Sequence, residues 1–160
     1  MIEQEQQARK IVKNYMWWSM GAGLIPVLFV DLIAVSGVQL KMLAEVSKVY
    51  GIEFQETRGK ALVASLIGYV VPNTLSFGSV GSLLKAIPLV GQLMGTPSMV
   101  LFCGASTYAL GKVFVQHFES GGTFLSFDPA KMKEHFKQEF EEGSKLAADL
   151  QEKTTTEVPA

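Results

Sequence analysis

The sequence contains a single cysteine, Cys103, in 160 residues. One cysteine excludes a disulfide within the chain and cannot by itself build a zinc site. The two histidines, His117 and His135, are far apart along the chain, and neither is expected to have a carboxylate at ligand spacing, so no metal site is predicted. No G-x-S-x-G motif is present, and Cys103 has no base nearby in the sequence. We therefore expect no cofactor and a protein that is not an enzyme.

Charged side chains are also scarce. They make up 18% of the residues, below the roughly one quarter that is usual in soluble domains, while hydrophobic residues make up 48%. The net charge of -1 excludes a general nucleic-acid-binding protein, because neutralising phosphates requires a basic surplus. No nucleic-acid partner is expected.

The scarcity of charge is greatest between Lys60 and Lys112, where 51 residues contain one ionisable side chain, Lys85. A helix rises about 1.5 Å per residue, so about 24 residues reach roughly 36 Å, whereas the hydrocarbon core of a bilayer is about 30 Å thick. The sequence predicts an all-α membrane protein with the lipid bilayer as partner. Its glycine-rich transmembrane hairpin would consist of Ala61–Leu84 and Ala86–Gly111, with Lys85 near the far turn.

Small residues recur at regular spacing in this apolar block. Gly91 and Gly95 are four residues apart, and so are Ala105 and Ala109. Small residues at this spacing let membrane helices approach each other closely. The pattern leaves two alternatives open, namely packing between copies of the chain in a homo-oligomer, and turns or kinks within one copy.

A second apolar region precedes the hairpin. The first fourteen residues are polar, and the apolar run that follows begins with Trp17 and Trp18, a pair suited to the interface between water and lipid. Pro26 interrupts this run, and Asp31 follows; a spanning helix would place the Asp31 carboxylate in hydrocarbon at a cost of roughly 3 kcal/mol. We therefore expect a re-entrant or interfacial pair of helices, Tyr15–Ile25 and Val27–Tyr50. Gly51 is expected to end the second of these helices.

The distribution of basic residues predicts the topology, since lysine and arginine collect on the cytoplasmic side of membrane proteins. Such residues lie before, between and after the apolar runs. All three polar regions lie on one side of the membrane if residues 15–38 form a re-entrant or interfacial pair and residues 61–111 form a transmembrane hairpin. Both termini are then cytoplasmic, and Lys112 lies at the cytoplasmic boundary. In the competing model the first run also spans the membrane, which places residues 39–60 or the C-terminal region outside.

The C-terminal region predicts a further helix. It starts at Asp128-Pro129, because an acceptor side chain at the cap and a proline in the first turn are favoured positions. Met132, Phe136 and Phe140 recur every four residues and form a stripe that requires a partner. That partner is the second helix of the N-terminal pair, the bilayer surface or another subunit. The predicted units are a membrane-associated domain (1–125), a cytoplasmic amphipathic helix (126–150) and a disordered tail (151–160).

A resemblance to a known family lies in three segments, GLIPVLFVDLIAVSGVQLKMLAEVSKVYGIEF, RGKALVASLIG and SLLKAIPLVGQLMG. Over roughly residues 10 to 125 the chain resembles a bacterial family of unknown function whose members are similar to YcjF-type inner-membrane proteins. The resemblance implies an inner-membrane location and a small Ras-like or dynamin-like GTPase as partner. Because this sequence carries no GTPase domain, such a partner would act in trans.

Three functions are compatible with these observations. The sequence favours a non-enzymatic inner-membrane anchor or scaffold that self-associates and recruits a cytoplasmic partner. One alternative is an oligomeric pore or membrane-remodelling protein in which Lys85 or Asp31 faces water. The other is a soluble helical protein that shields its hairpin until a trigger releases it.

Overall fold

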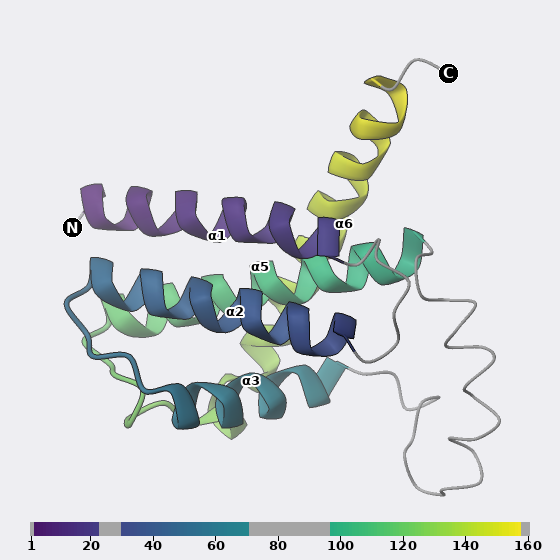
Figure 1. The fold of residues 1–160 in the computed structure, drawn as a ribbon. Coiled ribbons are helices and arrows are strands. Elements are labelled where there is room, and N and C mark those ends of the chain that lie inside the picture. Colours follow the sequence, from purple (N-terminus) through teal and green to yellow (C-terminus); the bar gives the residue numbers. More distant parts are fainter. Residues whose placement is uncertain (1, 23–29, 71–96, 158–160) are drawn as a thin grey trace, which may run out of the picture.

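Every regular element in the described part of the chain is an α-helix. The computed structural model describes residues 2–22, 30–70 and 97–157. The helices are α1 (Ile2–Ala22), α2 (Val30–Val49), α3 (Glu56–Val70), α5 (Pro97–Glu119) and α6 (Pro129–Glu157). Figure 1 shows α1, α2, α3 and α5 lying alongside one another, with α6 crossing them. Helix α5 is central, because it contacts each of the other four. The all-α prediction is confirmed.

Helix α1 begins much earlier than the predicted start at Tyr15. Residues four positions apart lie on one face of a helix, and α1 buries such a row against α5. The row consists of Ala8, Val12, Met16 and Met20. Its first half lies in the N-terminal stretch that the sequence analysis left out of any helix. That prediction is wrong because a single apolar row is hidden among many polar residues.

Aromatic side chains fill the core where α5 leads into α6. Phe114 stacks on Phe127 with ring centroids 4.4 Å apart, and Phe124 packs edge-on against Phe54 at 5.5 Å. The guanidinium of Arg58 donates hydrogen bonds of 3.3 Å to the carbonyl oxygens of Phe124 and Phe127. The segment between α5 and α6 is therefore fastened to α3 through its backbone as well as through its rings.

Two predicted helix ends are confirmed. Gly51 has a φ of 66° and follows α2. The amide of Ile52 donates to the carbonyl of Ser47 at 2.9 Å, which is the glycine-dependent closure expected at a helix C-terminus. At the start of α6, Asp128 Oδ1 accepts a hydrogen bond of 3.0 Å from the amide of Ala130.

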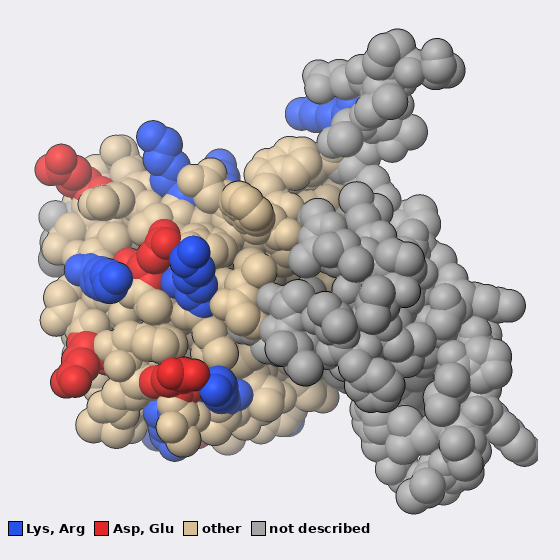
Figure 2. Space-filling view, viewed as in Figure 1, with Lys and Arg blue, Asp and Glu red and all other residues tan. Residues whose placement is uncertain are grey.

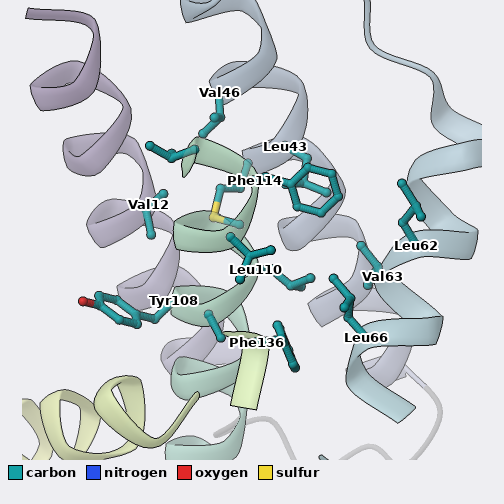
Figure 3. Close-up of a cluster of buried hydrophobic side chains, with 14 of the residues drawn as sticks. Val12, Leu43, Val46, Leu62, Val63, Leu66, Tyr108, Leu110, Phe114 and Phe136 are labelled. Atoms are coloured by element: carbon teal, nitrogen blue, oxygen red, sulfur yellow. The ribbon is translucent and has the colours of Figure 1, made fainter. Parts of the chain in front are cut away.

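The predictions for the C-terminal region need two corrections. Helix α6 continues to Glu157, so residues 151–157 are helical and not a disordered tail. The stripe of Met132, Phe136 and Phe140 packs on α5 and α3 rather than on α2. Phe136 is fully buried, in the same cluster as Leu110 and Leu66 (Figure 3), while Met132 and Phe140 are partly buried.

The predicted transmembrane hairpin has its two legs partly in α3 and α5. Its legs begin and end differently, because α3 starts at Glu56 and α5 continues past Gly111 to Glu119. Residues 71–96, with the turn between the legs, lie outside the described residues, as does Pro26. Among the helices that the structure describes, none is both long enough and hydrophobic enough to cross a membrane.

Glycines bring two helices close to α5. A Cβ at Gly111 would collide with the Val12 side chain of α1. A Cβ at Gly143 would lie 2.9 Å from the Tyr108 ring and 3.0 Å from the carbonyl oxygen of Ala105. The second neighbour is backbone, so α6 crosses α5 at a distance that only glycine permits.

The substitution Gly111→Ala tests this packing. We expect it to lower the free energy of unfolding by about 1–3 kcal/mol, because Val12 is branched at Cβ and has no rotamer that vacates the site. Gly68→Ala is the matched control, since nothing lies within 4 Å of its Cβ position. Removing a helical glycine there should raise stability by about 1 kcal/mol. Thermal unfolding followed by circular dichroism measures both; equal midpoints for the two variants would contradict the prediction.

Candidate functional site at the apolar end of the bundle

Helices α1, α2, α3 and α5 lie alongside one another, so each of them has one terminus at either end of the bundle. Helices α1 and α3 run towards one end, and α2 and α5 run away from it (Figure 1). That end is formed by Ala22, Val30, Val70 and Pro97, and we name it the apolar end. The opposite end, where α1 begins and α5 finishes, is named the polar end.

Side chains that carry charge at neutral pH (Asp, Glu, Lys and Arg) are segregated between these two ends. Helix α1 has none after Lys13, α3 has none after Lys60, and α5 has none before Lys112. Helix α2 has Asp31 at its second position and then none before Lys41. On the face drawn in Figure 2, charged side chains gather over the polar end, and few lie on the described surface nearer the apolar end.

The segments attached to the apolar end continue this pattern in the sequence. Residues 23–29 and 71–96 follow or precede the helix ends located there, and they contain one ionisable side chain, Lys85. The predicted packing residues Gly91 and Gly95 belong to the second segment. These residues, and the side chain of Asp31, lie outside the described residues.

Aromatic side chains are exposed near the apolar end. Trp17 and Trp18, the predicted interface residues, are 46% and 72% exposed on the last turns of α1. Tyr69 is exposed on the last turn of α3, and the ammonium of Lys133 lies 5.3 Å from the centre of its ring. Indole and phenol rings of this kind are typical of the boundary between lipid and water.

The predicted small-residue pair of α5 lies inside the fold. Ala105 and Ala109 are fully buried, and Gly143 of α6 lies directly against Ala105. Their close packing therefore joins helices of one chain. Lys112 follows one turn later, partly buried, with its ammonium 6.0 Å from the centre of the Tyr108 ring.

Buried polar groups connect the helices towards the apolar end. Gln39 of α2 is fully buried, and its Nε2 donates to Ser106 Oγ at 3.3 Å and to Thr107 Oγ1 at 3.2 Å. Ser19 of α1 donates to the carbonyl oxygen of Cys103 at 3.1 Å. Cys103 itself is buried. No sequence motif marks Gln39, which lies among the buried apolar residues of α2.

Three tyrosines make further links between helices by donating to glutamates. They are Tyr15 to Glu45, Tyr50 to Glu119 at 3.1 Å, and Tyr108 to Glu142 at 2.8 Å. Burial and the hydrogen bond to Glu45 raise the pKa of Tyr15 to about 12. Burial, followed by the bond to Glu119, also raises the pKa of Tyr50 above its usual value. No sequence motif marks these pairs.

A polar cleft of about 300 Å³ lies between α1, α5 and α6. Its lining includes Arg9, Lys112, Glu119, His135 and Glu139. The expectation that no carboxylate accompanies His135 is wrong, because Glu139 follows one turn later, with 3.8 Å between Nε2 and Oε1. The described residues contain no cluster of three metal-ligating side chains, and the mixed charges of the cleft select no single class of ligand.

These features define a class, an α-helical bundle with one charged end and one apolar end. The family model described as a domain of unknown function, DUF697, matches residues 1–145, and the chain belongs to that family. The chain is also similar to magnetosome membrane protein 22 of Magnetospirillum gryphiswaldense. The two are 38% identical over 143 residues, which cover 89% of this chain and 73% of that protein. No solved structure matches the chain.

The tyrosine pairs predict loss of stability in alkali. A raised pKa in the folded state favours neutral tyrosine, so this contribution is fully present below the unfolded value of about 10 and is lost as the pH rises beyond it. Tyr50→Phe should make the thermal midpoint less sensitive to pH above about 10. Glu119→Gln should lower the pKa of Tyr50, measured by phenolate absorbance, whereas the exposed control Glu53→Gln should not. A Tyr50 pKa unchanged by Glu119→Gln would contradict this assignment.

Proposed function

We propose that this chain is a non-enzymatic membrane anchor that inserts its apolar end into a bilayer. The segregation of charge carries the proposal. In a soluble bundle the surface of each helix is polar along its whole length. Here α1, α3 and α5 lose every Asp, Glu, Lys and Arg side chain on passing from the polar to the apolar end. Exposed residues of α3 beyond Lys60 include Ala61, Ala64 and Tyr69, whose desolvation costs little.

Helix α6 limits how deeply the bundle inserts. It crosses the other helices (Figure 1), and its Ala147 lies against the Cβ position of Gly104 near the apolar end. The same part of α6 carries exposed Lys145 and Asp149, which are costly to place in hydrocarbon. The hydrocarbon boundary therefore lies at about the level of Trp17 and Trp18, with α6 in the interfacial layer. The segments attached to the apolar end then extend into the lipid.

The membrane protein among the similar sequences supports the same location. The start of α1, the link between α2 and α3, and the C-terminal end of α5 share the polar end, as the hairpin and re-entrant topology requires. We place this end on the cytoplasmic side of a bacterial inner membrane. There it would recruit a partner, for which the family resemblance suggests a GTPase. Self-association would use Gly91 and Gly95, since Ala105 and Ala109 are buried within the chain.

Membrane extraction tests the anchor directly. The full chain, expressed in bacteria, should remain in the membrane fraction after carbonate treatment and float with vesicles of neutral phosphatidylcholine. Apolar insertion is insensitive to salt, whereas a purely electrostatic attachment is screened at about 1 M salt, where the Debye length is about 3 Å. A chain that stays in solution without detergent, and does not float with vesicles, would contradict the proposal.

Trp17 and Trp18 are the only tryptophans of the chain, so intrinsic fluorescence reports the proposed boundary. Their exposure predicts red-shifted emission without lipid and a blue shift in vesicles. Lipids brominated near the headgroup end of the acyl chain should quench the emission more than lipids brominated near the chain end. Trp17→Phe should leave most of the response, because Trp18 is the more exposed ring. Equal quenching by both lipids would place the indoles elsewhere.

A further inference from the structure

In each of the four bundle helices a lysine is the first cation met on leaving the apolar end. These residues are Lys13 in α1, Lys41 in α2, Lys60 in α3 and Lys112 in α5. They come from four different places in the sequence. Whether they act together depends on their levels along the bundle axis.

Contacts between the helices give these levels. The Cβ position of Gly111 lies against Val12, which brings Lys112 and Lys13 to one level. The Cβ position of Gly59 lies 3.3 Å from the Leu40 side chain, which does the same for Lys60 and Lys41.

Gln39 gives the level of Lys41 relative to Lys112, because its side chain bonds to Ser106 and Thr107 of α5. Helices α2 and α5 run in the same direction, so Lys41 lies level with residues 108 and 109 of α5. At about 1.5 Å per residue, this is about one helical turn from Lys112.

The lysines are also accessible to a ligand outside the chain. Lys13 and Lys41 are exposed and form no ion pair with the residues that the structure describes. Lys60 bonds to Glu56 at 2.8 Å, but both side chains are mostly exposed, so this pair contributes little. Lys112 is partly buried, with its ammonium near the Tyr108 ring. At least three of the four ammonium groups therefore face the surroundings.

We propose that Lys13, Lys41, Lys60 and Lys112 form a ring that binds the phosphate groups of anionic lipids. The inference rests on the proposed function, which sets the hydrocarbon boundary at Trp17 and Trp18. Lys13 precedes Trp17 by one turn, about 6 Å, and a headgroup layer is about 5–7 Å thick on each side of the bilayer. The ring therefore lies at the depth of the lipid phosphates. Long lysine side chains adjust to that depth while their stems stay on apolar surface.

Lipid selectivity in reconstituted protein tests the ring. The full chain is reconstituted into phosphatidylcholine vesicles, and contact with spin-labelled phosphatidylglycerol is compared with contact with spin-labelled phosphatidylcholine. The double variant Lys13→Gln/Lys41→Gln removes two ring members that lack an ion pair. The single variant Lys41→Gln is compared with the matched control Lys48→Gln, which removes the same charge from the same helix about 10 Å further from the apolar end. Lys13→Arg/Lys41→Arg keeps the charge.

The wild type should prefer the anionic lipid, and each lysine removed from the ring should reduce this preference by up to about fivefold at low salt. The control and the arginine variant should keep the preference. Retention in the vesicles with equal contact for both lipids would overturn the ring and leave the anchor intact. So would equal losses in Lys41→Gln and Lys48→Gln. Failure of the wild type to enter the vesicles would overturn both proposals. Circular dichroism confirms that each variant retains its helices.

Discussion

The arrangement of the whole bundle depends on close packing around α5. This helix is surrounded by α1, α2, α3 and α6. Where these helices cover it, its side chains are removed from solvent, and a charged side chain there would be buried. Gly111 admits α1, and Gly143 admits α6. Backbones that approach so closely leave room only for small or well-fitted side chains. The order of the other helices around α5 follows from where it presents glycine, alanine and hydroxyl groups.

The core changes character along α5. Near the polar end it consists of phenylalanine rings around Phe114 and Phe127, which are stabilised by removal from water. Towards the apolar end it consists of small residues and of hydroxyl and amide groups bonded between helices, as at Gln39 and Ser106. Where lipid surrounds a bundle, removal from water no longer drives association, and close packing with hydrogen bonds takes its place. The change in the core therefore parallels the change in surroundings that we propose.

Features that depend only on residues close together in the sequence could be predicted from it. The all-α class, the end of α2 at Gly51 and the start of α6 at Asp128 follow from local pattern and capping. The start of α1 was missed because the few apolar residues that it buries lie among many polar ones. The surface covered by Phe136 was predicted wrongly, since an apolar stripe shows that a partner is needed without showing which one. The small pair Ala105 and Ala109 likewise does not distinguish contacts within a chain from contacts between chains.

The candidate site also has one part that the sequence predicts and another that it does not. Scarcity of charge marks the apolar segments directly, whereas the level of Lys13 relative to Lys112 depends on how α1 and α5 are aligned, which no local pattern encodes. Alignment also explains why α6 matters for function. Since α6 is charged and crosses the bundle, it resists burial in hydrocarbon just where the aromatic rings favour the interface. These opposing preferences confine the bundle to one depth, with its polar end held clear of the lipid and open to a partner.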